Sequence, residues 1–357
     1  KELMEYLSRY PVVYFGETHD SVQDHDAQLA ILEYFNKRYP GEVALGLEMF
    51  RRPAQAGLDS YIRGEMDERE FVKLFYKNWG GLYPYYREIT DYARRNGIPL
   101  VALNASKELR KEIRQKGIDG LDAEMKNDLP EMNMDDPYHR ALMKAHFGKH
   151  VKGPKQLETF YRMQVLWDET MAQSAADYLN SPAGGGKRLL IFAGDAHVRY
   201  GLGIPRRLFR RLPIPYAIVS AYTVEIAEEK KKNIMHIDVP AIPLLAGDFL
   251  WGVRYEGLEG ETVRLGVTIG KVPGDKAEGK GVSVLGIVPG SSAEKAGILK
   301  GDLLVSMDGQ ELHEPLDLTY QVGLHKPGDS GNVELIRDGK RLSLEVTYYP
   351  PKSTPTH

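Results

Sequence analysis

The sequence predicts an α/β fold, a doubly wound and mostly parallel sheet with a helical subdomain, followed by a small, mainly β domain. Over residues 1–222, short apolar runs alternate with longer amphipathic segments, which is typical of parallel strands joined by helices. One interval between strands, residues 105–180, is long enough for several helices. After about residue 261, short strands and frequent glycines replace this alternation.

Five apolar runs, rich in β-branched or aromatic residues, predict buried strands. They are Pro11–Phe15, Val43–Leu47, Pro99–Leu103, Leu189–Ala193 and Tyr216–Ser220. The segments between them predict helices, because apolar residues recur there at helical spacing and turn residues bound them. The clearest are His25–Arg38, a helix opened by the acidic residues 67–70, and Tyr83–Asn96 before Gly97.

These patterns divide the chain into three parts. Residues 1–222 form the α/β domain, residues 223–260 an irregular closing segment and linker, and residues 261–350 the small β domain. In the last part we expect strands at 263–269, 281–288, 303–307, 332–337 and 341–347, and short helices at 291–296 and 316–322. A domain of this length lies within the usual size range.

The net charge and the absence of cysteine argue against several classes of function. The formal net charge is -3, which gives no reason to expect a nucleic-acid partner. The absence of cysteine excludes disulfides, thiolate metal ligands and a cysteine nucleophile. We interpret the basic run Arg206, Arg207, Arg210 and Arg211 as a solvated helix face. The chain begins at Lys1 and not at Met, so we expect that an upstream segment was removed, and a signal peptide or a lipid anchor is compatible with this.

Two G-x-x-H sequences follow predicted strands directly, Gly16–His19 and Gly194–His197. In open α/β sheets ligands bind outside the carboxyl ends of the strands. Polar residues stand at other strand ends as well, so we expect one edge of the sheet to carry Glu17, His19, Glu48, Asn104, Asp195 and His197.

Two imidazoles with several carboxylates suit a divalent ion of the Mn, Fe, Co or Zn type, and also acid–base catalysis. We expect Glu17, His19, Glu48 and His197 as metal ligands, and as the catalytic groups if the protein is a hydrolase. The alternative is that some of these carboxylates only cap the following helices, with Asp195 the first candidate.

A second candidate site lies on the helix predicted at 157–180. Tyr161, Gln164 and Asp168 share one face of it. A tyrosine can ligate haem iron, although packing is the usual role of a helical tyrosine. His146 and His150 lie one turn apart before this helix, a spacing that permits joint ligation. The sequence also contains an aromatic cluster, Trp79, Tyr83, Tyr85 and Tyr86. We interpret it either as part of the core or as the wall of a site for a planar ligand.

Residues 10–222 resemble the ChaN-like haem-binding domain of the Tiki superfamily. Five segments carry the resemblance in order: Phe15–Asp20, Leu47–Phe50, Val101–Asn104, the helix containing Phe160–Gln164 and Trp167–Ala172, and Ala193–His197. ChaN-like members are bacterial lipoproteins of iron uptake that bind haem between subunits through a tyrosine.

The resemblance therefore implies a haem- or iron-related ligand-binding protein of the cell envelope, in the periplasm or on the outer membrane. It also implies a homodimer and an N-terminal lipid anchor to the membrane. Tyr161 is the expected haem ligand, with His150, Gln164 and Asp168 nearby. The same superfamily contains metal-dependent Tiki proteases with paired G-x-x-H motifs, so a divalent-metal-dependent hydrolase or peptidase is the alternative.

Residues 263–348 resemble a PDZ domain of the bacterial HtrA-protease type. The resemblance rests on Arg264–Val267, Val288–Ile298, Lys300–Leu304 and Asp308–Gly309. PDZ domains add an extended peptide or a protein C-terminus as a strand, and Leu265, Gly266 and Val267 would supply the loop that holds its carboxylate. The alternatives are a spacer or dimer contact with an unused groove, or a scaffold in which both sites are residual.

Overall fold

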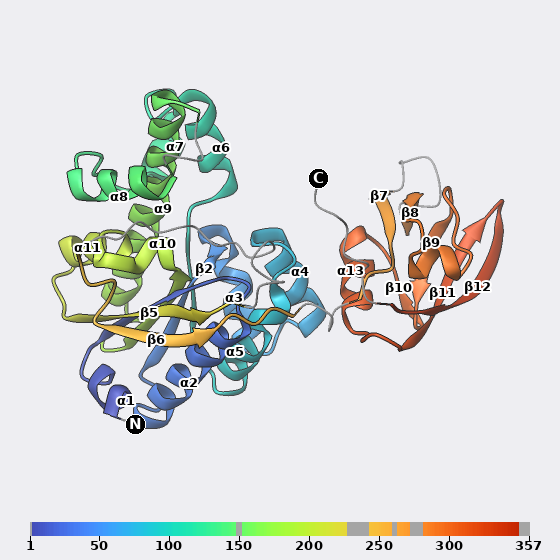
Figure 1. The fold of residues 1–357 in the computed structure, drawn as a ribbon, viewed down its shortest axis with the longest axis horizontal. Helices are drawn as coiled ribbons and strands as arrows, with labels where there is room; N and C mark the ends of the chain where they lie inside the picture. The colour runs from blue at the N-terminus through green and yellow to red at the C-terminus, as the bar shows by residue number, and fades with distance from the viewer. Residues whose placement is uncertain (1, 148–151, 227–242, 259–262, 272–280, 350–357) are drawn as a thin grey trace. The chain divides into compact units, whose positions relative to one another are not determined.

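A computed structural model describes residues 2–147, 152–226, 243–258, 263–271 and 281–349 of the 357-residue chain. The chain forms two compact units, Lys1–Gly257 and Leu258–His357 (Figure 1). The first is an α/β unit with a six-stranded sheet, and the second is built on an antiparallel sheet. The predicted fold class is therefore confirmed.

The sheet of the α/β unit has the strand order β3-β2-β4-β1-β5-β6, and each neighbouring pair is parallel. The buried apolar runs predicted as strands form five of its members. The strands are β1 (Val12–Glu17), β2 (Val43–Arg51), β3 (Leu100–Asn104), β4 (Arg188–Gly194), β5 (Tyr216–Glu225) and β6 (Phe249–Arg254). Buried runs of this kind suit a sheet that is covered on both faces.

Strand β6 is a correction to the sequence analysis. It lies in the segment 223–260 that we expected to be irregular, and it pairs in parallel with β5 from Val219↔Phe249 to Glu225↔Arg254. The cause is a short run of Phe, Leu and Trp, beginning at Phe249, within an otherwise turn-rich stretch. Strand β5 also extends past the predicted Ser220 to Glu225, where it pairs with β6.

The long interval between β3 and β4 holds several helices, as predicted. Helix α9 (Pro154–Asn180) packs its small residues Ala172, Ala175 and Ala176 into the main core beside the strands. Figure 1 shows α6, α7 and α8 gathered around one end of α9. The remaining helices of this unit are α1 (Glu2–Leu7), α2 (Val22–Arg38), α3 (Gln55–Ile62), α4 (Glu68–Asn78), α5 (Tyr83–Arg95), α6 (Lys107–Lys116), α7 (Ala123–Asp128), α8 (Pro137–Phe147), α10 (Asp195–Val198) and α11 (Ile204–Arg211).

The second unit has the sheet order β12-β11-β9-β8-β7, with β10 paired to β9. Among the described residues β7 is an edge strand, and α13 lies against it. The elements are β7 (Val267–Lys271), β8 (Val282–Ile287), α12 (Ser292–Lys295), β9 (Leu303–Met307), β10 (Gln310–Glu311), α13 (Pro315–Gly323), β11 (Ser330–Arg337) and β12 (Lys340–Thr347). In neither unit is a described helix both long and apolar enough to cross a membrane.

Gly16 allows β1 to approach the turn after β4. A Cβ at this position would lie 2.6 Å from Asp195 Oδ1 and 3.1 Å from Asp195 Cα. Gly16→Ala is therefore expected to lower the free energy of unfolding by about 1–3 kcal/mol, the usual cost of overpacking. Urea denaturation measures the change. Gly81→Ala is the control, because the space around Gly81 is open to 4.0 Å, and equal stability of the two variants would contradict the packing argument.

Candidate functional site

The two G-x-x-H turns lie side by side at the carboxyl edge of the sheet. Strands β1 and β4 are parallel neighbours, and Glu17 is in register with Gly194. Strand β2 lies on the other side of β4 and carries Glu48. The structure thus brings together the turns that contain His19 and His197, as the sequence predicts.

Glu17 and His19 form the first of two pairs at this edge. His19 Nδ1 lies 2.8 Å from Glu17 Oε1, the Tyr86 hydroxyl donates to the same oxygen, and the Gln28 amide donates to Oε2. Burial opposes the charge of Glu17, but His25 and His19 outweigh it and hold the pKa of this carboxyl below its usual value. Burial likewise opposes the charge of His19, but Glu17 and Glu48 raise its pKa.

Helix α2 fixes the turn that follows β1. Asp24 Oδ2 accepts a hydrogen bond from the Thr18 amide at 2.7 Å, and His25 Nε2 lies 3.1 Å from the His19 carbonyl. Burial raises the pKa of Asp24 to about 6. The sequence analysis missed Asp24, His25 and Gln28 as supports, although the i, i+4 spacing of Asp24 and Gln28 places them on one helix face.

His197 lies between two carboxylates and forms the second pair with Glu48. Its Nε2 is 3.3 Å from Glu48 Oε1, and its Nδ1 is 2.6 Å from Asp168 Oδ1. The Gly194 amide donates to Glu48 Oε2 at 2.7 Å. Although burial opposes it, the charges of Glu48 and Asp168 raise the pKa of His197 to about 10. His197 in turn brings the pKa of Glu48 to about 2 and lowers that of Asp168, both against the effect of burial.

The two pairs meet at Gly194. A Cβ on this glycine would lie 2.8 Å from His19 Nε2 and 3.5 Å from Glu48 Oε2. The donor types suit a divalent ion, but both nitrogens of His197 already face carboxylates. Within the described ranges, no group of three or more His, Asp or Glu side chains is arranged to hold a metal. The predicted metal site therefore finds no support in this arrangement of the described residues.

Asn104 and Asp195 have other partners at the same edge. Asn104 Nδ2 donates to the Glu48 carbonyl at 3.0 Å, and its Oδ1 accepts from the Ala105 amide at 2.8 Å. Asp195 accepts hydrogen bonds from Ser220 and Arg199, so it ties α10 to β5. Both residues thus position backbone at the strand ends. Asp195 opens α10 and makes no side-chain cap to that helix.

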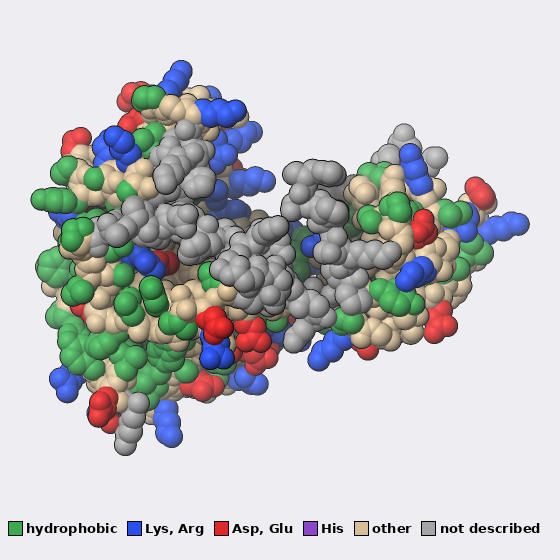
Figure 2. All heavy atoms as spheres, viewed as in Figure 1, with side chains coloured by type: hydrophobic (Ala, Val, Ile, Leu, Met, Phe, Trp, Pro, Cys, Tyr) green, Lys and Arg blue, Asp and Glu red, His purple; other side chains and the backbone are tan. Residues whose placement is uncertain are grey.

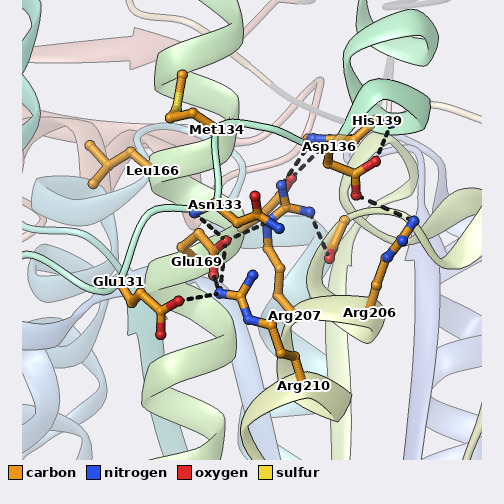
Figure 3. A network of polar contacts seen from close by, with 12 residues as sticks. Glu131, Asn133, Met134, Asp136, His139, Leu166, Glu169, Arg206, Arg207 and Arg210 are labelled. Atoms are coloured by element: carbon orange, nitrogen blue, oxygen red, sulfur yellow. Dashed lines mark hydrogen bonds and ion pairs between the residues drawn. The ribbon is translucent and has the colours of Figure 1, made fainter.

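The polar network continues from the sheet edge into the helices, and Figure 3 shows its part around His139, Glu169 and Arg207. Asp168 Oδ2 lies 3.3 Å from His139 Nε2, and Arg207 donates to His139 Nδ1 at 3.0 Å. Arg207 Nε is 3.2 Å from the buried carboxylate of Glu169. The interpretation of this basic run as a solvated face is therefore wrong for Arg207, which is buried.

The three residues predicted on α9 do not act as a unit. Gln164 and Asp168 both face His197, and the Gln164 amide lies 2.9 Å from its Nδ1. Tyr161 instead places its hydroxyl 3.3 Å from the Asp136 carbonyl and 3.4 Å from that of Met134. Burial raises the pKa of Tyr161, which disfavours the phenolate form that binds iron. His150 lies outside the described residues.

Tyr200 is a candidate that the sequence analysis missed. It has φ 62° and ψ 4°, a left-handed conformation that a bulky side chain adopts only when its surroundings impose it. Such strain costs about 1–3 kcal/mol and clusters at functional sites. Tyr200 packs against a cluster that includes Met143 and Tyr161, and its amide donates to the Ala246 carbonyl at 2.7 Å. The sequence signal for this candidate is its position, because Tyr200 lies only three residues after His197 of the second G-x-x-H turn.

Leu265, Gly266 and Val267 lie together at the start of β7. Gly266 has φ 83°, and a Cβ there would lie 2.2 Å from Ser291 Cβ. The carbonyls of Leu265 and Gly266 accept hydrogen bonds from the amides of Ala293 and Val288. These two carbonyls therefore tie the loop to the segment that follows β8 and to α12.

Two family models match the chain. Residues 3–208 match the family described as haem-binding uptake, Tiki superfamily, ChaN. Residues 252–348 match a PDZ domain. The structure described as cofacial heme binding to ChaN of Campylobacter jejuni superposes with a TM-score of 0.52 at 16% identity. It covers 72% of this chain and 91% of that one, which shows a shared fold.

Curated relatives match parts of the chain. Over 89 residues it is 39% identical to a "Probable periplasmic serine endoprotease DegP-like" of Pseudomonas fluorescens, covering 23% of this chain and 19% of that protein. Over 230 residues it is 25% identical to "Protein RETICULATA-RELATED 5, chloroplastic" of Arabidopsis thaliana. This match covers 60% of this chain and 31% of that protein. The chain thus spans less than a third of the length of either relative.

His197→Gln is expected to lower the free energy of unfolding by about 3–5 kcal/mol, because Glu48 and Asp168 would remain buried without their shared cation. The stabilisation by His197 is fully present below its unfolded pKa of about 6.5 and disappears as the pH rises through about 10. That of Glu48 is present above about 4.5 and disappears as the pH falls through about 2. Urea unfolding between pH 6 and 10 measures the effect of His197, and urea unfolding between pH 5 and 2 measures that of Glu48.

In the wild-type protein the free energy of unfolding should fall as the pH rises from 6 to 10. In His197→Gln this fall should be smaller. The His313→Gln variant is the control, since the His313 side chain is 47% exposed and lies 3.6 Å from the exposed carboxylate of Glu311. Parallel pH profiles for wild type and His197→Gln would contradict the assignment of charge to this imidazole.

Proposed function

Because this chain belongs to the haem-binding uptake family ChaN of the Tiki superfamily, we propose that it binds haem in haem or iron uptake at the bacterial cell envelope. The match of residues 3–208 to that family carries the proposal. The PDZ unit would bind an extended peptide or a protein C-terminus. The periplasmic name of the DegP-like relatives supports the envelope setting.

The surroundings of Tyr200 fit a planar, largely apolar ligand. The segment next to it contains Leu244 and Leu245, which are 54% and 86% exposed. Exposed leucines beside a strained tyrosine provide apolar contact and a phenolic oxygen, which can serve as an axial ligand of haem iron. Bound haem would supply the iron, and the chain's part is to hold and orient it.

Tyr161 is the second candidate ligand, as predicted from the sequence. It lines a cavity of about 390 Å³ together with apolar Met143 and Leu157 and the cations Arg140 and Lys144. Cations at the rim could pair with the haem propionates. However, Tyr161 would have to give up its hydrogen bonds to Met134 and Asp136 to reach the iron, whereas Tyr200 is already held in a strained position.

Haem held between two copies of the chain would explain why apolar side chains remain exposed on the α/β unit. Figure 2 shows hydrophobic side chains gathered near the β5–β6 edge of this unit. Tyr222, Val224 and Leu250 are each at least half exposed there. We infer a homodimer that covers part of this surface and, from the family, an N-terminal lipid anchor.

The PDZ proposal rests on the free edge of β7. This strand ends the sheet among the described residues, so its outer edge can pair with a peptide strand. Helix α13 lies against β7 and contributes buried Leu318 and Val322 to the unit's core. The loop at Gly266 stands at the start of the same strand, where a peptide carboxylate would meet backbone amides.

For haem, Tyr200→Phe is expected to weaken haemin binding by at least about tenfold, the loss expected when a bond to iron is removed. Tyr161→Phe should have a smaller effect, and Tyr34→Phe on α2 is the control. Absorbance titration with haemin gives the three affinities. If Tyr161→Phe shows the large loss instead, Tyr161 is the ligand. Full affinity in both variants would contradict ligation by either tyrosine.

For the PDZ unit, a fluorescent peptide that ends in a valine carboxylate should bind, and its C-terminally amidated form should bind at least about tenfold more weakly, because a charged hydrogen bond is lost. Gly266→Ala should also lose binding, since its Cβ would displace Ser291. Gly323→Ala is the control, with open space around Gly323. Fluorescence anisotropy measures binding, and equal affinity for both peptide forms would refute carboxylate recognition by this loop.

A further inference from the structure

Helix α11 lines a second cavity of the α/β unit, with lining residues other than those of the cavity beside Tyr161. The cavity has a volume of about 360 Å³ and is lined by Asn133, Asp136, Arg206, Arg207, Phe209 and Arg210. In Figure 3, the three arginines extend from α11 toward α9 and the segment before α8. The cavity therefore combines several guanidinium groups with one aromatic ring.

Arg210 Nη2 lies 3.1 Å from Glu169 Oε2 and Arg206 Nη1 lies 3.3 Å from Asp136 Oδ2, but both buried acids have further partners. Glu169 has Arg207 Nε at 3.2 Å and Arg211 Nη1 at 2.6 Å, and it accepts from the Asn133 amide at 3.0 Å. Asp136 accepts from the backbone amides of Tyr138 and His139, both at 3.1 Å. Both carboxylates thus keep partners when Arg206 and Arg210 are engaged elsewhere.

Arg206 and Arg210 are the accessible cations of the cluster. Their side chains are 52% and 34% exposed, whereas those of Asp136 and Glu169 are 4% and 0% exposed. Arg210 also lies 3.8 Å from Glu131, whose side chain is 80% exposed. A surface pair of this length contributes little, so a ligand can displace Glu131.

We propose that the cleft between Arg206 and Arg210 binds the carboxylate or phosphate of a small anionic ligand, whose apolar part packs on Phe209. A guanidinium matches the two oxygens of such a group with parallel N–H bonds. Phe209 is 47% exposed in the same cavity. Asn133 Oδ1 accepts from the Asp135 amide, so its Nδ2 is the donor that this side chain can offer. The inference does not rest on haem binding.

The test uses 3-phenylpropionate as an aromatic carboxylate and inorganic pyrophosphate as a competitor. Saturation-transfer NMR on the full chain detects weak binding of the first, and displacement by the second tells whether a phosphate is accepted. The Arg206→Gln/Arg210→Gln variant should lose the signal or bind at least about tenfold more weakly. Its fold should survive, because Asp136 and Glu169 keep other partners, and its urea midpoint checks this.

Arg63→Gln is the matched control, since Arg63 forms an exposed pair with Glu65 away from the cleft. Signal in wild type and in Arg63→Gln, but not in the double variant, supports the site. Phe209→Ala should weaken 3-phenylpropionate more than pyrophosphate if the ring contacts the apolar part. An absent wild-type signal, or an equal signal in the double variant, would overturn the proposal.

Discussion

The charge on His197, held between Glu48 and Asp168, is the interaction on which the α/β unit depends most. It joins β2, the turn after β4 and helix α9, three segments that are distant in sequence. Each of these charges would be costly to bury alone, and the network is tolerable because every member has a partner. Through Asp168 the same network reaches His139 and Arg207, so α8 and α11 are fixed by it as well.

Tyr200 follows this network closely along the chain. In the turn that carries His197, both ring nitrogens face buried carboxylates. Three residues later the backbone enters the left-handed region at Tyr200. A stable network can hold such strain where a ligand site needs it. On this view the paired G-x-x-H turns serve as the frame of a binding surface, and their histidines need not contact the ligand.

Much of this edge could be predicted from the sequence, because the carboxyl ends of parallel strands meet at one edge whatever the strand order. That reasoning brought Glu17, Glu48 and the two G-x-x-H turns together. It could not find Tyr86 or Gln28, whose bonds to Glu17 depend on how helices dock. The sequence alone does not distinguish a buried Arg207 from a solvated one. The difference depends on the fold, which brings Glu169 next to it. Strand β6 was missed because its apolar run is short and lies among turn residues.

The most direct test of this account is a haemin titration of the purified chain, followed by visible absorbance, with metal analysis of the same preparation. The account predicts a saturable Soret change at a fixed ratio of haem to chain, without a stoichiometric divalent metal. A stoichiometric divalent metal with only unsaturable haem uptake would contradict it. That result would instead favour the metal-dependent hydrolase, with Glu17, His19, Glu48 and His197 as its ligands.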